Sequence, residues 1–203
     1  MALPPDILRQ LEAGAVDLTS QVLACVIAGI GQQQTLAGRP ALGLPLDDYA
    51  CLLARYFPDS GDALFRQAEN ALASAERLDE FDDLLHMLME YRSADTPDHT
   101  WLAHAVAIAC MGDGHLWQDM GLPHRAVLNQ LMQHHFTDLA ARNTADMKWK
   151  KFFYRQLCER AEIPICKSPS CTACCDYDAC FGPEDGHVPI MTTDQHVMVH
   201  IQP

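Results

Sequence analysis

Residues 76–92 read ERLDEFDDLLHMLMEYR, and this stretch decides the fold class. Its large apolar side chains recur every three or four residues, so on a helix they lie along one stripe. These side chains belong to Phe81, Leu84, Leu85, Leu88 and Tyr91. Acidic residues fall on the opposite side, as in a helix that packs one face on a protein core. The stretch predicts such a helix, paired antiparallel with a second helix at residues 61–73.

The same helical spacing continues over most of the first 160 residues. Residues 6–30 repeat apolar side chains at helical intervals between Pro5 and Gly31, which mark a start and a stop. Further helices are expected at 49–57, 99–110, 115–120, 124–136 and 145–161. Asp98 and Thr144 stand where the N-cap of a helix is expected. Because alternating β patterns are scarce, we predict an all-α fold, a bundle or orthogonal array of six to eight helices over residues 1–165.

The charge balance limits the partners that this protein can have. The chain of 203 residues carries 14 Lys and Arg against 27 Asp and Glu, a net charge of −13. Such a surface repels the phosphates of nucleic acid and the anionic inner leaflet of a membrane, so neither is expected as a partner. No apolar run approaches the roughly 20 residues that span a bilayer, and the first residues do not resemble a signal peptide. We therefore expect a cytoplasmic protein.

Five of the nine cysteines lie close together after the last predicted helix. Residues 166–180 read CKSPSCTACCDYDAC, which spaces Cys166, Cys171, Cys174 and Cys180 as C-x4-C-x2-C-x5-C. An odd number of cysteines, crowded in this way in a chain expected in the cytoplasm, favours metal binding over disulfides. We predict a Cys-rich loop at 166–186 that holds an iron–sulfur cluster, followed by a tail at 187–203 with no clear pattern.

The spacing alone leaves other metal sites open. Thiolates are soft ligands that suit iron–sulfur clusters, zinc and Cu(I). The first three cysteines are spaced as at the start of plant-type ferredoxins, where the fourth lies much further along the chain. A structural zinc site usually combines two short hooks, and this loop offers one. Further ligands could come from Cys175, Cys158 on the preceding helix, or His115 in a Gly-flanked turn.

Basic residues concentrate just before and within the cysteine loop. All four lysines of the chain (Lys148, Lys150, Lys151 and Lys167) lie there, and with Arg155 and Arg160 they make six of the 14 basic residues. One interpretation is the solvated face of the last helix. The other is a patch that offsets the negative charge of a bound cluster, or guides an oxyanion or an acidic partner to it. On the second interpretation, reversing Lys150 and Lys151 to Glu slows metal loading or transfer.

Catalytic motifs are missing from the sequence. It contains no Walker A loop, G-x-S-x-G, H-E-x-x-H or G-x-G-x-x-G pattern, so we do not expect an enzyme. Most of the ten histidines have ordinary structural explanations. His104 lies among small apolar residues and is expected at the edge of the core, and of the pair His134 and His135 one is expected to pack while the other faces water.

Residues 101–184 resemble a known family. DMKWKKFFYRQLCE at 146–159, the four-cysteine spacing and then CFGPE at 180–184 are similar to the NifQ family of nitrogen-fixation proteins. The resemblance implies a cytoplasmic protein that handles molybdenum for the iron–molybdenum cofactor of nitrogenase. It also implies a molybdenum–iron–sulfur cluster, donated to the NifEN scaffold and NifH. The motif cysteines of the family carry over to Cys166, Cys171, Cys174 and Cys180, while Cys175 departs from the motif.

Three functions follow from these observations. The first is a carrier that receives molybdate-derived molybdenum and donates it from a molybdenum–iron–sulfur cluster. The second is an electron-transfer protein with an iron–sulfur cluster on the same cysteines, and the third is a helical interaction module with structural zinc. Molybdenum content separates the first from the second, and iron and sulfide content separates both from the third.

Overall fold

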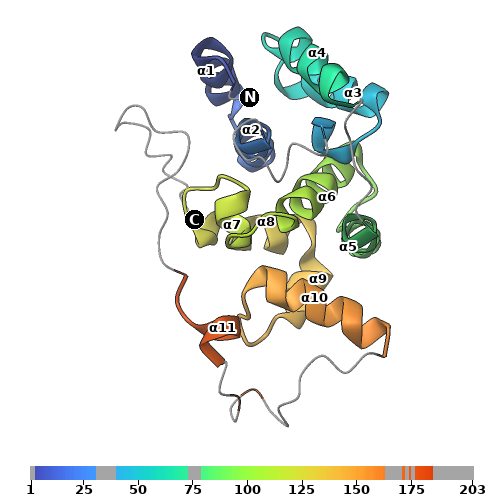
Figure 1. Ribbon diagram of the computed structural model, residues 1–203, viewed down its shortest axis with the longest axis vertical. Helices are drawn as coiled ribbons and strands as arrows, with labels where there is room; N and C mark the ends of the chain where they lie inside the picture. Colours follow the sequence, from blue (N-terminus) through green and yellow to red (C-terminus); the bar gives the residue numbers. More distant parts are fainter. Residues whose placement is uncertain are drawn as a thin grey trace.

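A computed structural model describes residues 3–30, 40–72, 79–162, 171, 174 and 177–184 (Figure 1). Across these ranges the regular structure is entirely helical, so the all-α prediction is confirmed. The helices of seven residues or more are α1 (Pro5–Gly14), α2 (Leu18–Ile30), α3 (Leu46–Tyr56), α4 (Gly61–Leu72), α5 (Asp79–Glu90), α6 (Pro97–Cys110), α8 (Arg125–His135) and α10 (Trp149–Arg160). Shorter ones are η2 (Pro40–Gly43), α7 (Leu116–Asp119), α9 (Thr137–Arg142) and α11 (Tyr177–Phe181). The eight longer helices agree with the predicted six to eight.

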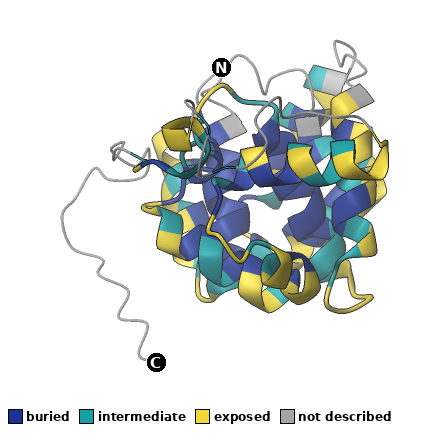
Figure 2. Ribbon diagram, turned by 90° about the horizontal axis from the view of Figure 1, so that it is seen from below, coloured by how far each residue is buried: buried dark blue, intermediate teal, exposed yellow. Residues whose placement is uncertain are grey.

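Helix α6 forms the centre of the body, and its sequence explains why. The ten residues from Trp101 to Cys110 are all buried, so this helix is apolar on every side. A helix of that kind is stable only when other helices surround it. Helices α2, α5 and α7 pack against it, and Figure 2 shows the buried residues gathered inside a ring of exposed surface. His104 is buried there, with Nδ1 3.3 Å from the carbonyl oxygen of Leu42, as expected of a core-edge histidine.

The predicted pairing of residues 61–73 with 76–92 is wrong. Helix α4 packs on α3, and α5 packs on α6 (Figure 1). The apolar stripe of α5 is buried as predicted at Phe81, Leu84 and Leu88, but its partner is the central helix. The stripe could not identify that partner, because α4 and α6 both offer apolar surface and α6 offers far more of it.

The apolar pattern of residues 6–30 divides into two helices. Helix α1 ends at Gly14, where a Cβ atom would stand 2.8 Å from the carbonyl oxygen of Tyr56, so a glycine permits this close approach of α1 and α3. The next helix then begins with a reciprocal cap. The backbone N–H of Ser20 donates to Asp17 Oδ1 at 2.7 Å, and that of Asp17 donates to Ser20 Oγ at 3.0 Å. These bonds satisfy N–H groups that a helix start leaves without partners.

Helix α10 lies against the body through an aromatic cluster. Trp149, Phe152 and Phe153 are buried, and the indole N–H of Trp149 donates to Asn129 Oδ1 on α8 at 2.7 Å. The helix begins later than predicted from Thr144. The side chain of Asn143 bonds both the N–H and the carbonyl of Met147, each at 2.9 Å, which holds the chain in a turn until Lys148. The run of basic residues that begins with Lys148 therefore starts at the N-terminus of α10.

The cysteine region also contains a helix that the sequence did not predict. Residues 177–181 form the single turn α11, whose carbonyl at Cys180 accepts a hydrogen bond from the backbone N–H of Lys148 at 2.8 Å. The predicted boundary at residue 166 and the tail at 187–203 lie outside the described residues. Of the helices that are described, none is both long and apolar enough for a bilayer crossing.

Candidate functional site

Three of the four motif cysteines fall in the described part of the chain. Cys171, Cys174 and Cys180 are partly exposed free thiols, and the backbone N–H of Cys174 donates to the carbonyl of Cys171 at 3.2 Å. Cys166, and with it Cys175 and Lys167, lies outside the described residues. No three His, Cys, Asp or Glu side chains within the described ranges converge closely enough to hold a metal ion. The complete ligand set therefore stays a prediction.

Arg155 of α10 reaches toward one of these thiols. Its Nη1 lies 3.8 Å from Cys171 Sγ, while its Nε donates to Glu159 Oε1 at 2.7 Å. The bond to Glu159 and the nearby Cys171 sulfur raise the pKa of Arg155. Arg155 therefore places a positive charge beside a sulfur atom that is predicted to bind a metal. The predicted basic patch thus touches the Cys-rich stretch predicted at 166–186, the cysteine segment, at Arg155.

Cys180 is held against the helical body from two directions. Lys148 gives α11 two hydrogen bonds, from its backbone N–H to Cys180 and from its Nζ to the carbonyl of Asp178, both 2.8 Å long. Cys180 and Phe181 also pack on the edge of the core. The chemistry of the donor set fits a metal cluster, because the sulfur atoms are soft, partly exposed ligands and that of Cys171 lies beside the Arg155 guanidinium.

The two additional ligand candidates are placed differently. Cys158 is half-buried on α10, one turn after Arg155. His115 faces a carboxylate, with Nδ1 3.7 Å from Glu184 Oε1. A role for either residue as a metal ligand stays a prediction.

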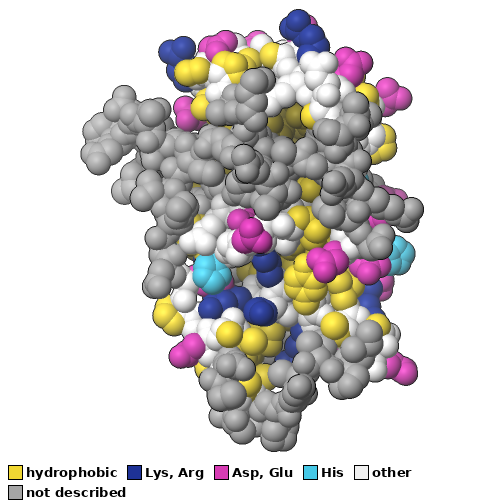
Figure 3. Space-filling view, viewed as in Figure 1, with side chains coloured by type: hydrophobic (Ala, Val, Ile, Leu, Met, Phe, Trp, Pro, Cys, Tyr) yellow, Lys and Arg dark blue, Asp and Glu magenta, His cyan; other side chains and the backbone are white. Residues whose placement is uncertain are grey.

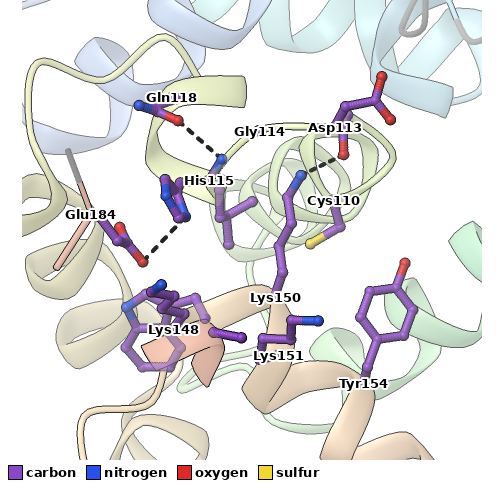
Figure 4. A pocket seen from close by; sticks show the side chains of 14 residues that line it. Cys110, Asp113, Gly114, His115, Gln118, Lys148, Lys150, Lys151, Tyr154 and Glu184 are labelled. Carbon is purple, nitrogen blue, oxygen red and sulfur yellow. Dashed lines mark hydrogen bonds and ion pairs between the residues drawn. The ribbon is translucent and has the colours of Figure 1, made fainter. Parts of the chain in front are cut away.

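A pocket of about 470 Å³ opens beside the cysteine segment, between the turn that follows α6 and the N-terminal half of α10 (Figure 4). Its polar lining includes Asp113, His115, Gln118, Lys148, Lys150, Lys151, Tyr154 and Glu184, and Ala179 of α11 also contributes. In Figure 3, Lys and Arg side chains gather near a histidine on this face, over the region of α7, α10 and α11. Three of the five residues predicted as a basic patch therefore line one concavity.

Lys150 is not an open cation of this patch. Its side chain is 15% exposed and forms an ion pair with Asp119, which is 8% exposed, and its Nζ donates to the carbonyl of Gly112 at 2.6 Å (Figure 4). A Cβ atom at Gly112 would stand 2.5 Å from the carboxyl carbon of Asp119, so this approach requires glycine. The ion pair joins α10 to α7, and the bond to Gly112 joins α10 to the turn after α6, so the role of Lys150 is structural.

Glu184 closes the other side of the pocket. Its side chain is 6% exposed, and its Oε1 lies 3.7 Å from His115 Nδ1 and 4.0 Å from Arg125 Nε. The Nε of Arg125 is buried and makes no hydrogen bond in the described structure, although its Nη2 donates to the carbonyl of Met147 at 3.1 Å. Glu184 thus connects the end of the cysteine segment to His115 and Arg125 of the helical body.

A second kind of cysteine lies at the wall of this pocket. Cys110 is buried at the end of α6, and burial raises the pKa of its thiol to about 12, with the Asp119 carboxylate adding to the effect and Lys150 opposing it. The thiol is therefore protonated at neutral pH and acts as a small apolar side chain. Its position on the pocket does not make it a metal ligand.

Sequence reasoning did not find Asp119, Gly112 or Glu184. Asp119 gave no signal in the sequence, because a single acidic residue in the stretch LWQD belongs to no recognisable motif. The signal available in the sequence was the glycine pair at 112 and 114, which permits a tight turn around a carboxylate. Only the packing of α10 on that turn shows that Lys150 and Asp119 meet.

Comparisons with known proteins show which family the chain is similar to. A family model described as NifQ matches residues 22–182, a range that includes all four motif cysteines. The chain is 41% identical to Protein NifQ of Azotobacter vinelandii over 152 residues, 70% of this chain and 78% of that protein. It is 33% identical to a NifQ homolog of Sinorhizobium fredii over 175 residues, 84% and 75% of the two chains. It is also 37% identical to Protein NifQ of Klebsiella pneumoniae over 146 residues, 69% and 85%. No solved structure matches the chain.

Proposed function

Since this chain belongs to the NifQ family of nitrogen-fixation proteins, we propose that it carries a molybdenum–iron–sulfur cluster and donates molybdenum from it. The cargo would be held by Cys166, Cys171, Cys174 and Cys180. The recipients would be the proteins that assemble the iron–molybdenum cofactor, NifEN and NifH, in the cytoplasm. The protein would act as a stoichiometric carrier and not as an enzyme.

The observation that carries this proposal is the contrast in placement of the sulfur atoms. Cys171, Cys174 and Cys180 are partly exposed at the edge of the molecule, while Cys25 and Cys110 are buried in the body. Partly exposed sulfur atoms, one of them beside Arg155, can be loaded from solution and reached by a partner. A carrier needs such access, because its cargo must leave.

The helical body has a definite part in this function. Lys148 fixes the backbone of α11, and Glu184 fixes the chain just after it, so Cys180 has a defined position on the body. Arg155 places a positive charge near Cys171. Thiolates and sulfides make a bound cluster anionic, so these cations favour its retention. Molybdenum takes more ligands than a single cysteine provides, which leaves labile positions for release.

The test is the metal and sulfide content of the protein purified without oxygen. We expect iron, molybdenum and acid-labile sulfide in the wild-type protein after molybdate loading, and a loss of most of all three in Cys171→Ser. Cys51→Ser is the matched control, because Cys51 is an exposed free cysteine on α3. Zinc in place of iron, or equal metal content in both variants, would overturn the proposal. Iron and sulfide without molybdenum would point to electron transfer.

Donation is tested separately. Loaded protein is mixed with molybdenum-free NifEN and NifH, the proteins are separated, and molybdenum is measured in each. We expect molybdenum to move to the partners at about one equivalent or less per carrier, with no turnover. Molybdenum that stays on the carrier under reducing conditions would contradict the donor role.

A further inference from the structure

Two histidines from different helices meet on the helical body. His99 lies in the first turn of α6, and His135 is the last residue of α8. The Nδ1 atom of His135 lies 3.4 Å from Nε2 of His99, and the ring centroids are 4.9 Å apart. Both residues are partly exposed, so solvent can reach the pair. Neither residue belongs to the cysteine segment or lines the pocket of Figure 4.

The surrounding structure holds both rings in place. Thr96 is the N-cap residue of α6, but its hydroxyl makes no capping bond and lies 2.7 Å from His99 Nδ1. The carbonyl of His135 accepts a hydrogen bond from the backbone N–H of Ser93 at 2.8 Å. The end of α8 is therefore fixed to the chain that leads into α6. Histidines that bind metals usually have such a partner on the other ring nitrogen, as His99 has here.

The two rings are neutral at pH 7. Burial lowers the pKa of His99, and burial together with the nearby His99 and His134 lowers that of His135 to about 4. A neutral imidazole has one N–H group and one nitrogen with a free lone pair, which can bind a metal. When the Nδ1–H group of His99 donates to Thr96, its Nε2 lone pair is directed to the side of His135.

The spacing of the two nitrogens fits a shared metal ion. Their separation of 3.4 Å is long for a hydrogen bond, which usually spans about 2.7–3.2 Å. The centroids are also closer than in a straight bond of this length, since such a bond adds the radius of both rings to the distance between the nitrogens. Two nitrogens that are each about 2.0–2.1 Å from a tetrahedral zinc ion stand about 3.3–3.4 Å apart. Ligands at right angles, as in tetragonal copper sites, would stand only about 2.9 Å apart.

The charges around the pair favour a cation. The carboxylates of Asp98 and Asp17 both favour positive charge on the ring at the end of α8. Two arginines also lie nearby, but each is already paired with a carboxylate, Arg55 with Asp98 and Arg92 with Asp95. Asp17 forms no ion pair with any described residue, so its negative charge is available to a bound cation.

We propose that His99 and His135 together bind a zinc ion, with water molecules in its remaining positions. In the metal-free protein the Nδ1–H group of His135 faces His99; for zinc binding this proton moves to Nε2 of the same ring, and no proton is released overall. Two protein ligands hold zinc less tightly than the four of a structural site, so the ion is exchangeable. It would join the start of α6 to the end of α8. The site contains no cysteine, so it does not rest on the proposed carrier function.

The experiment is a zinc titration of the full-length, metal-free protein, observed by NMR of its ¹⁵N-labelled imidazole rings. A chelating buffer fixes the concentration of free zinc, so zinc that is taken up by cysteines does not alter the comparison. We expect the ring signals of His99 and His135 to shift together. In His135→Gln, the free zinc needed to shift His99 is expected to rise at least tenfold, which corresponds to about 1.4 kcal/mol.

His134→Gln is the matched control, since His134 is an exposed neighbour whose Nδ1 lies 2.7 Å from the carbonyl oxygen of Gln130. It is expected to leave the zinc response of the pair unchanged. Signals of His99 that shift at the same free zinc in His135→Gln, or a loss as large in His134→Gln, would overturn the proposal. So would rings that do not respond to millimolar zinc. Iron, molybdenum and sulfide content is expected to be the same in His135→Gln and wild-type protein, so failure of the zinc site is distinguishable from failure of the cluster.

Discussion

The helical body and the cysteine segment contain the same reactive residue in opposite settings. Cys110 of the body is buried, and burial raises the pKa of its thiol to about 12. Cys180 of the segment is half-exposed, on a single helical turn held by Lys148. Cys110 acts in the body as an apolar side chain, whereas the described cysteines of the segment leave their sulfur atoms partly accessible. Placement and not residue type decides which thiols of this protein can do chemistry.

The largest expected effect comes from exchanging one sulfur in each region. Cys180→Ser is expected to lose most of the bound iron and molybdenum while the free energy of unfolding of the metal-free protein hardly changes. Cys110→Ser is expected to keep its metals and to lower that free energy by about 1–3 kcal/mol, because it buries a hydroxyl. Metal analysis and urea unfolding of both variants measure the two effects. Loss of metal in Cys110→Ser, or loss of stability in Cys180→Ser, would contradict the comparison between body and segment.

The next effect separates two neighbouring lysines of α10. Lys150→Met leaves Asp119 buried without its partner and is expected to cost about 3 kcal/mol of stability. Lys151→Met removes an exposed charge and is expected to change stability by less than about 0.5 kcal/mol. Urea unfolding of the metal-free variants gives both numbers. Equal losses in the two variants would mean that the Lys150–Asp119 pair does not fasten α10 to the body.

A smaller effect is expected at the turn that receives Lys150. Gly112→Ala brings a methyl group within 2.5 Å of the Asp119 carboxyl carbon, and we expect a loss of about 1–3 kcal/mol as the carboxylate is displaced. Gly61→Ala is the control, since its nearest neighbour would be an ordinary contact 3.6 Å away. Thermal unfolding of the two variants checks this, and similar melting temperatures would argue against a tight turn.

The smallest effect depends on pH and concerns the body alone. Burial, with His99 and His134 nearby, lowers the pKa of His135 to about 4 from the usual 6.5. Between these values the unfolded chain binds a proton that the folded chain does not, so stability is complete above pH 6.5 and falls as the pH drops toward 4. We expect His135→Gln to remove about 1 kcal/mol of this loss, after allowance for partial exposure. The free energy of unfolding at pH 7 and at pH 5 measures this loss. His86→Gln, which replaces an exposed histidine, is the control and is expected to leave the loss unchanged.

The sequence predicted the helical body well because periodic burial leaves a direct pattern. The stripe at Phe81, Leu84 and Leu88 and the presence of a helix at 99–110 were visible in the order of residues. The break between α1 and α2 was missed, since it depends on a local cap at Asp17 and on contact with Tyr56 from another helix. Helix partners were also missed, because an amphipathic stripe does not specify what it packs against.

Only the identity and spacing of the site residues along the chain could be predicted. The spacing of Cys171, Cys174 and Cys180 is a property of the sequence, and so is the run of lysines before them. That Lys150 pairs with Asp119, while Lys151 is exposed and forms no ion pair with any described residue, is a property of packing. Two adjacent, identical residues thus have different roles, which no reading of charge along the chain could distinguish.

The most direct test of the central claim is X-ray absorption at the molybdenum edge of the loaded, anaerobically purified protein. A cluster on the cysteine segment predicts sulfur atoms bound to molybdenum and iron atoms as its next neighbours, and both signals are expected to disappear in Cys180→Ser. Molybdenum surrounded by oxygen alone, unchanged in that variant, would contradict the claim. It would mean that the molybdenum is held as an oxyanion and not in a cluster.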